Sequence, residues 1–294
     1  MKRLAATLCI LSLGGTTMLA GNSNRYTPDL KVPYKRVQSS LQAPTKDRAL
    51  NLEIFNPEGH KKGDKRPAIV FFFGGGWTGG NPRQFYQQSR FLTDRGMVAI
   101  CAWYRVKTTP FDCVEDGKSA VRYIREHAAE LGVDPDQIVA SGGSAGGHVA
   151  ACTGVIAGFD SENENLDVRS VPNAMVLFNP VIDTTEKGYG LKKVGEDRKT
   201  DISPCHHVKK GIPPTLIIHG TDDRTVPFEN VARFTKLMNA AGNTCTLMPF
   251  ENAGHGFFNG ALFRKGSSDA MFDATMKQTV DFLTEQGILP VEAK

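Results

Sequence analysis

The sequence predicts an α/β protein in which a mostly parallel β-sheet is covered by helices on both faces. Short apolar segments of strand length alternate with amphipathic segments of helix length from residue 50 to residue 283. Most of the apolar segments are continuous, as expected for strands that are buried on both faces. Glycines close the helical segments, at Gly132, Gly242 and Gly287. This order of elements is typical of one layered domain.

The composition agrees with a single globular domain. The chain has 294 residues, of which 40% are hydrophobic and 22% charged, and a chain of this length buries a full core without staples. We expect the domain to span residues 49–290. The formal net charge is +4, and no basic run recurs with interleaved aromatic residues, so nucleic acid is not an expected partner.

Residues 1–20 have the pattern of a signal peptide. A positively charged start is followed by an apolar run over residues 4–13, which is too short to span a bilayer. Cleavage after Ala20 is one option, and a cut nearer Gly14 or Gly15 is the other. No later stretch approaches the ~20 apolar residues of a membrane helix, so no integral membrane span is expected. The pattern predicts a secreted or periplasmic protein.

The first half of the domain follows an extended lead-in. Residues 21–48 are polar, contain prolines and leave room for at most one edge strand. Apolar and polar residues alternate with period two over residues 50–55, which predicts a strand with one polar face. Residues 68–73 and 97–103 are continuously apolar, which predicts strands buried on both faces. A helix is expected over residues 114–131, because its apolar side chains fall largely on one face.

The second half continues this alternation. A short strand over residues 137–141 leads into a glycine-rich turn, and an alanine-rich helix follows to about residue 157. Three further strands are expected at 174–178, 215–219 and 244–248. Two further helices are expected around 231–238 and 272–283. The longest irregular segment, residues 183–214, is a place for a small lid or a substrate-facing loop.

The strongest chemical signal is a G-x-S-x-G pattern over residues 142–146, between a strand and a helix. The serine of such a turn has a strained backbone and an exposed hydroxyl, and the glycines remove side chains that would collide. The helix N-terminus behind Ser144 favours negative charge, and the amide of Ala145 points to where an oxyanion would form. A glycine-rich turn without chemistry is the alternative. We expect Ser144 to be a nucleophile.

A serine hydroxyl is a weak nucleophile near neutral pH and needs a base. His255 is the candidate among seven histidines, because it follows a strand and lies between glycines in a loop. It also comes after the serine and after a candidate acid, although a loop histidine with a structural role is the alternative. The other histidines compete poorly, since most lie on helices, in a charged loop or in the irregular segment.

An acid should orient the imidazole and stabilise its charged form. Asp222 and Asp223 follow a buried strand, although a turn-forming role is the ordinary one for such a pair. Asp183, after the preceding strand, is a third candidate. Glu251 ranks last, because it lies on the same loop as His255.

A row of three glycines follows the strand at 68–73. Glycines let backbone amides approach a ligand closely, as an oxyanion hole requires, and Gly75 and Gly76 are the candidate donors. A flexible turn is the alternative. The sequence has no GxxxxGK[ST] loop, no HExxH and no group with metal-ligand spacing, so neither a cofactor nor a metal is expected.

The cysteines beyond residue 20 are widely spaced along the chain, and this spacing matches neither a zinc site nor a redox pair. Cys101 and Cys152 lie in apolar segments and are interpreted as small buried hydrophobes. One disulfide among Cys113, Cys205 and Cys245 is conceivable in an oxidising compartment, and the sequence does not pair them.

These motifs, in this order, resemble the α/β-hydrolase superfamily, specifically its acetyl esterase and lipase branch, which includes feruloyl and acetyl-xylan esterases of the BD-FAE type. The acid motif of the family, H-G-x-x-D-x-x-V-P, matches residues 219–227 and assigns the acid to Asp223. Its A-G-H-G segment matches residues 253–256 and gives His255, and its nucleophile turn gives Ser144. The family's H-G-G-G-W matches at 74–77 but departs at Phe73, where the family usually has histidine.

The resemblance implies a fold and a reaction. The fold is a mainly parallel eight-stranded sheet with helices on both faces and a small insert after the sixth strand. The reaction is the hydrolysis of carboxylic esters of short acyl groups through an acyl-enzyme, with the oxyanion held by the amides of Gly75, Gly76 and Ala145. Small-molecule esters, or acetyl or feruloyl esters linked to carbohydrate, are the implied substrates, and no cofactor is implied.

Three other functions stay open at this point. Prolyl-peptidase-like serine peptidases share the fold and the triad, but the sequence contains no large gating domain. A formamidase resembling the kynurenine type fits an exported protein poorly. A non-catalytic binding protein of the same fold would be expected to lack a member of the triad, and none is missing.

Overall fold

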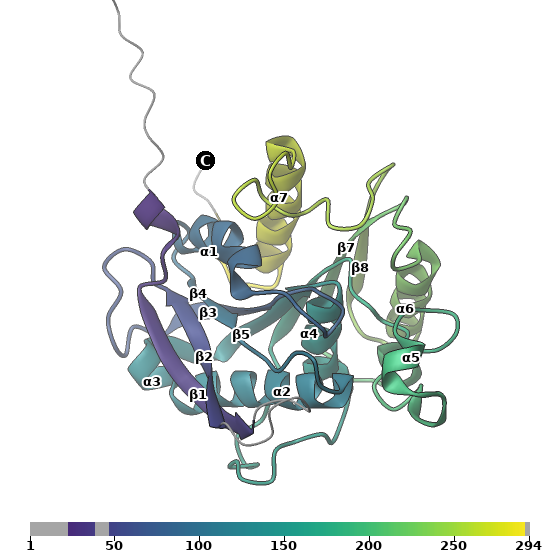
Figure 1. Ribbon diagram of the computed structural model, residues 1–294. Coiled ribbons are helices and arrows are strands. Elements are labelled where there is room, and N and C mark those ends of the chain that lie inside the picture. Colours follow the sequence, from purple (N-terminus) through teal and green to yellow (C-terminus); the bar gives the residue numbers. More distant parts are fainter. Residues whose placement is uncertain (1–22, 39–46, 292–294) are drawn as a thin grey trace, which may run out of the picture.

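The computed structural model describes residues 23–38 and 47–291, so the signal peptide expected at 1–20 lies outside the described residues. These residues form an eight-stranded sheet with the order β1-β2-β4-β3-β5-β6-β7-β8 (Figure 1). The strands are β1 (Leu30–Gln38), β2 (Asp47–Phe55), β3 (Arg66–Phe72), β4 (Val98–Ala102), β5 (Val133–Gly143), β6 (Ala174–Phe178), β7 (Thr215–Gly220) and β8 (Cys245–Phe250). All pairs from β4 to β8 are parallel, whereas β1 and β2 are antiparallel. The expected α/β-hydrolase sheet is confirmed.

Helices cover both faces of this sheet. The α-helices are α1 (Tyr86–Thr93), α2 (Pro110–Glu126), α3 (Ala128–Leu131), α4 (Ala145–Val155), α5 (Leu191–Val194), α6 (Phe228–Ala240) and α7 (Asp269–Glu285). The 3₁₀ helices are η1 (Ser23–Tyr26), η2 (Pro82–Phe85), η3 (Glu196–Arg198) and η4 (Pro204–His206). Helices α1 and α7 lie above the sheet in Figure 1, and α2, α4 and α6 pack on its other face.

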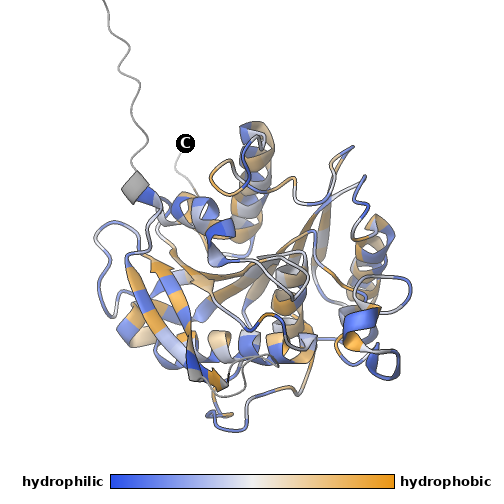
Figure 2. Cartoon of the chain, viewed as in Figure 1, coloured by the Kyte–Doolittle hydropathy of each residue, from blue (hydrophilic) through white to orange (hydrophobic). Residues whose placement is uncertain are grey.

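Alternate side chains of each central strand enter two separate cores. In β3, Val70 and Phe72 pack with α2 and α4, while Ile69 and Phe71 pack with α1 and α7. The strand is therefore apolar without interruption from Ala68 to Phe72, where both of its faces are buried. Figure 2 shows the contrast with β1 and β2, where hydrophilic and hydrophobic residues alternate along the strand at the sheet edge.

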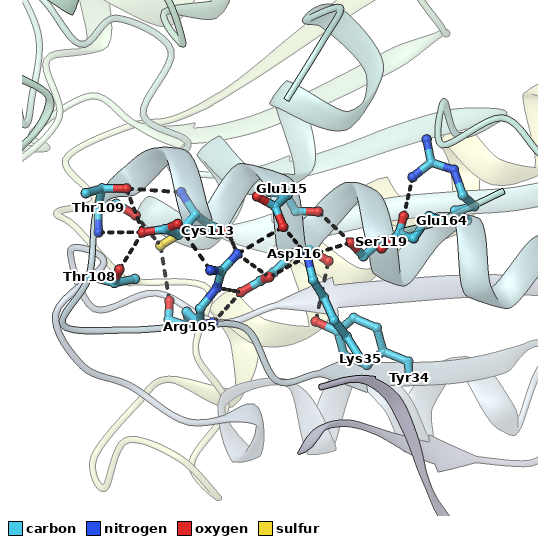
Figure 3. A network of polar contacts seen from close by, with 12 residues as sticks. Tyr34, Lys35, Arg105, Thr108, Thr109, Cys113, Glu115, Asp116, Ser119 and Glu164 are labelled. Atoms are coloured by element: carbon cyan, nitrogen blue, oxygen red, sulfur yellow. Dashed lines mark hydrogen bonds and ion pairs between the residues drawn. The ribbon is translucent and has the colours of Figure 1, made fainter. Parts of the chain in front are cut away.

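The edge strand β1 is joined to α2 by a network of ion pairs and hydrogen bonds (Figure 3). The carboxylate of Asp116 is fully buried and accepts two hydrogen bonds of 2.8 Å from the guanidinium of Arg105. Lys35 of β1 lies 3.0 Å from the same carboxylate and 2.5 Å from Glu115. A buried carboxylate needs such partners, because an unpaired one would be strongly destabilising. The network explains how a polar lead-in segment becomes a fixed strand.

Several elements differ from the expected bounds. The helix expected at 114–131 is divided at His127 into α2 and α3, and α2 begins earlier, at a capping box of Thr109 and Asp112. Strand β5 begins at Val133, four residues before the apolar stretch that predicted it. The segment η2–α1 was not expected, because it is rich in glutamine and lacks a continuous apolar stripe. The insert at 183–214 holds α5, η3 and η4.

The described cysteines are all free and buried. A disulfide among Cys113, Cys205 and Cys245 is therefore not formed in this structure. Burial raises the pKa of the Cys205 and Cys245 thiols to about 11, so both thiols are protonated near neutral pH. Within the described residues, no helix has both the length and the apolar character needed to cross a membrane.

Candidate active site

Ser144 occupies a sharp turn between β5 and α4, with φ 55° and ψ −121°. Such a left-handed conformation is strained for a residue with a side chain, so the surrounding structure must impose it. The amide of Ser144 donates to Phe178 at 2.9 Å, and its carbonyl accepts from His148 at 3.0 Å and from Val181 at 3.2 Å. These bonds hold the serine backbone between two strands and the first turn of α4.

The glycines around Ser144 are required by contacts of the backbone. A Cβ at Gly146 would lie 2.1 Å from the carbonyl oxygen of Phe72, and one at Gly142 would lie 2.4 Å from the carbonyl oxygen of Gly146. Both distances are far below van der Waals contact, so any other residue would push α4 away from β3 and β5. The G-x-S-x-G pattern thus reflects close packing of one helix against two strands.

Three side chains that are distant in the sequence form one hydrogen-bonded chain. The Nε2 atom of His255 lies 2.9 Å from the Oγ atom of Ser144, and its Nδ1 atom lies 2.7 Å from Oδ2 of Asp223. Ser144 follows β5, Asp223 follows β7 and His255 follows β8. The carboxyl ends of these parallel strands lie at the same edge of the sheet, which is why the three residues meet.

Asp223 is suited to hold the imidazole in one tautomer. Although burial alone would raise it, the pKa of Asp223 is lowered by the hydrogen bond with His255 and by the amides of Val226 and Thr225. Both amides donate to Oδ1 at 2.9 Å, and Asn179 donates to Oδ2 at 2.9 Å. An ionised carboxylate accepts the Nδ1–H of His255, so the lone pair of Nε2 faces the serine hydroxyl.

The other candidate acids do not reach His255. Asp222 is exposed, and the carboxylate of Asp183 is paired with Arg233 and accepts the Thr185 amide at 2.9 Å. Glu251 is exposed and lies 3.4 Å from the hydroxyl of Thr221. The structure therefore brings Asp223, rather than these three, to the imidazole.

The row of glycines after β3 forms a loop beside Ser144. Three successive residues have positive φ, at 129° for Gly75, 59° for Gly76 and 61° for Trp77. Within the described residues, the amides of Gly75, Gly76 and Ala145 have no hydrogen-bond acceptor. Unpaired amides beside a serine hydroxyl form the arrangement that stabilises a tetrahedral oxyanion.

A pocket of about 460 Å³ opens over the serine. Gly75, Gly76, Ser144 and His255 are among the residues that line it. Aromatic residues that the sequence did not single out also line it, namely Tyr189, Phe258 and Phe263, together with the polar side chains of Gln84, Thr225, Asn259 and Arg264. Tyr189 comes from the 183–214 insert, which therefore does face the pocket. Among the described residues, no group of three histidine, cysteine or acidic side chains is arranged to hold a metal ion.

Comparison with known proteins finds esterases both by sequence and by structure. The sequence profile of the BD-FAE family matches residues 52–238. An acetylxylan esterase from Xylanibacter ruminicola is 30% identical over 67% of this chain and 42% of its own length. A probable isoprenylcysteine alpha-carbonyl methylesterase from Arabidopsis thaliana is 27% identical over 76% of this chain and 52% of its own. The chain thus spans about half the length of the curated relatives it matches.

Solved structures of esterase 2 from Thermogutta terrifontis are similar over nearly their whole length. The native form is 42% identical with a TM-score of 0.82, covering 92% of this chain and 96% of that chain. A form phosphorylated by paraoxon is 44% identical with a TM-score of 0.80, covering 90% and 96%.

Proposed function

The chain belongs to the BD-FAE family of α/β-hydrolases, and from that premise we propose that it is a serine esterase for carboxylic esters of short acyl groups. The observation that carries the proposal is the continuous chain of hydrogen bonds from Asp223 through His255 to Ser144. It ends beside three backbone amides that have no acceptor within the described residues. Nucleophile, base, orienting acid and oxyanion donors are the parts that ester hydrolysis requires.

The proposed reaction has two halves. His255 takes the proton of Ser144 as Oγ attacks the ester carbonyl, and the amides of Gly75, Gly76 and Ala145 hold the oxyanion. The protonated imidazole then gives its proton to the leaving alcohol, which leaves an acyl group on Ser144. Water, deprotonated by His255, attacks this acyl-enzyme and releases the carboxylic acid.

The substrates are proposed to be small esters, including acetyl or feruloyl esters linked to carbohydrate. The pocket of about 460 Å³ and its aromatic lining support a compact acyl group. The similarity to an acetylxylan esterase supports a carbohydrate-linked alcohol. A series of aryl esters with increasing acyl length tests this, since long acyl chains are expected to be poor substrates.

We also propose that residues 1–20 direct export, so that the esterase acts outside the cytoplasm. The charged start and the short apolar run support this proposal. N-terminal sequencing of protein from the exported fraction tests it, and an intact Met1 there would contradict it.

The decisive experiment compares wild type with Ser144→Ala on a chromogenic acetate ester. We expect kcat to fall by more than about 10⁴-fold, because no other residue can form the acyl-enzyme. Ser141→Ala is the matched control, since Ser141 lies buried on β5, three residues before Ser144, and its Oγ has no hydrogen-bond partner among the described residues. Paraoxon should also leave a phosphoryl adduct on Ser144 of the wild type. Lack of turnover by the wild type on any short ester would overturn the esterase proposal and favour a binding protein.

A further inference from the structure

The loop that carries the proposed oxyanion donors has no histidine at its start. Phe73 is fully buried, and its ring stacks on Tyr104 with 4.3 Å between ring centroids. The hydroxyl of Tyr104 donates to the Phe73 carbonyl at 2.6 Å. These contacts fix the last residue before the glycines, but a phenyl ring cannot hydrogen-bond to the glycines themselves. Their anchor must come from another side chain.

Gln84 of η2 supplies a hydrogen bond to the first glycine. Its Oε1 atom accepts from the amide of Gly74 at 2.6 Å, and its side chain is buried, with 7% of the residue exposed. Gly74 itself touches the nucleophile turn, because a Cβ there would lie 3.3 Å from Cβ of Ser144. Gln84 therefore fixes the backbone at the point where the glycine loop meets the serine.

The nitrogen of the Gln84 side-chain amide points to the loop that carries His255. Nε2 of Gln84 donates to Oδ1 of Asn259 at 2.9 Å, and Nδ2 of Asn259 donates to the carbonyl of Gly256 at 2.7 Å. Gly256 directly follows His255, and Asn259 is only 5% exposed. Two buried amides thus join the oxyanion loop to the loop that carries the base.

The orientation of each side-chain amide, that of Gln84 and that of Asn259, is determined by its hydrogen-bond partners. The Gly74 amide can only donate and the Gly256 carbonyl can only accept, so the oxygen of Gln84 must face Gly74 and the nitrogen of Asn259 must face Gly256. The remaining nitrogen of Gln84 then meets the remaining oxygen of Asn259. Because both side chains are neutral, the link adds no charge beside the imidazole or the developing oxyanion.

We propose that Gln84 is a positioning residue that, through Asn259, sets the spacing between the oxyanion amides and His255. This inference rests on the proposed esterase function. Three successive residues of the oxyanion loop have positive φ, and none of them belongs to a helix or strand. Donors must be held within about 0.5 Å of the productive geometry, so a loop of this kind needs an external support.

The test is a double-mutant cycle of Gln84→Ala and Asn259→Ala on a short aryl ester. Each single variant is expected to lower kcat by about 10- to 100-fold, while KM changes by less than about threefold, because misplaced donors weaken only the transition state. The double variant is expected to be no more than about threefold slower than the slower single variant, because both changes break one link.

Gln87→Ala is the matched control. Gln87 lies in α1, next to η2, and its Oε1 accepts the Leu262 amide at 3.2 Å, so it holds the same loop without reaching the glycines. It is expected to keep kcat within about threefold of wild type. An equal loss in Gln87→Ala would show general loosening of the loop and would overturn the proposal.

A second variant keeps the test decisive if Gln84→Ala does not fold. Gln84→Glu preserves shape and the bond from Gly74, but it cannot donate to Asn259, and it brings negative charge toward the oxyanion. We expect it to lose at least about 10-fold in kcat. Folded variants with wild-type kcat, losses confined to KM, or fully additive losses would each overturn the positioning role. Inactive wild-type protein would instead overturn the esterase proposal itself.

Discussion

Two glycine-rich segments face each other in the pocket, and they are held in different ways. The turn over residues 142–147 is fixed by close backbone packing, because a Cβ at Gly142 would lie 2.4 Å from the Gly146 carbonyl oxygen and one at Gly146 would lie 2.1 Å from the Phe72 carbonyl oxygen. The loop over residues 74–80 also packs on its own backbone, where a Cβ at Gly80 would lie 2.1 Å from the Gly74 carbonyl oxygen, and in addition it is held by the side chains of Gln84 at Gly74 and Lys193 at Gly76. The turn is thus held by packing of backbone against backbone, whereas the loop depends in addition on two side chains that the fold brings to it.

The two segments also contact each other away from the serine. Trp77 of the loop is fully buried and packs edge-on against His148 of α4, with 5.1 Å between ring centroids. The Nε2–H of His148 donates to the Ile202 carbonyl at 2.7 Å, which ties α4 to the 183–214 insert. A change on either side of this contact should therefore reveal how strongly each segment depends on the other.

The largest expected effect is that of Gly146→Ala in the nucleophile turn. Its Cβ would lie 2.1 Å from the Phe72 carbonyl oxygen and 2.3 Å from that of Phe73, so β3 and α4 must separate. We expect the free energy of unfolding to fall by more than about 4 kcal/mol, measured by urea denaturation.

Gly79→Ala in the loop is the control for this change. A Cβ at Gly79 meets nothing within 4 Å, so stability should stay within about 0.5 kcal/mol of wild type. Similar losses in both variants would show that the loss in Gly146→Ala does not come from its contact with the Phe72 carbonyl.

A smaller effect on the free energy of unfolding is expected at low pH, through His148. Burial lowers the pKa of His148 to about 4, although its hydrogen bond to Ile202 acts in the opposite direction. Between pH 6.5 and 4 the unfolded chain binds this proton and the folded chain does not, so stability falls as the pH decreases. The contribution is about 3 kcal/mol across that window.

The measurement is urea denaturation at several pH values for wild type and His148→Gln. The variant should lose stability less steeply between pH 6.5 and 4, while His219, whose pKa burial also lowers, continues to contribute. His206→Gln, at an exposed position, should keep the wild-type slope. Identical slopes for His148→Gln and wild type would rule out this role of the buried imidazole.

The smallest effect is expected from Lys193→Met. Nζ of Lys193 donates to the Gly76 carbonyl at 2.8 Å and lies over the rings of Trp77 and Tyr189. The side chain is exposed, so we expect kcat/KM to fall only about threefold, and less in high salt. The neighbouring exposed Lys192→Met should leave kcat/KM unchanged. A tenfold loss would mean that the loop depends on Lys193 far more than its exposure implies.

The strands and the nucleophile turn could be predicted because their signals are local. Continuous apolar stretches such as 68–73 indicate strands whose two faces are both buried. The G-x-S-x-G turn was predictable because its residue types form a short contiguous motif between a strand and a helix, although Gly146 itself packs against Phe72. The segment η2–α1, with helix α1, could not be predicted, because its glutamines rather than an apolar stripe join it to the loop after His255. The aromatic lining of the pocket was missed for the same reason, since Tyr189 and Phe263 are assembled only by the fold.

The sequence by itself determined the order of the strands and of the main helices other than α1, and the residue types of the proposed reacting groups, because these leave signals in neighbouring residues along the chain. It left the choice between Asp222 and Asp223 to a family motif. Only the tertiary structure decided which carboxylate faces the imidazole and which side chains hold the oxyanion loop. Hydrogen bonds between residues such as Gln84 and Asn259, 175 positions apart, leave no periodic signal in the sequence.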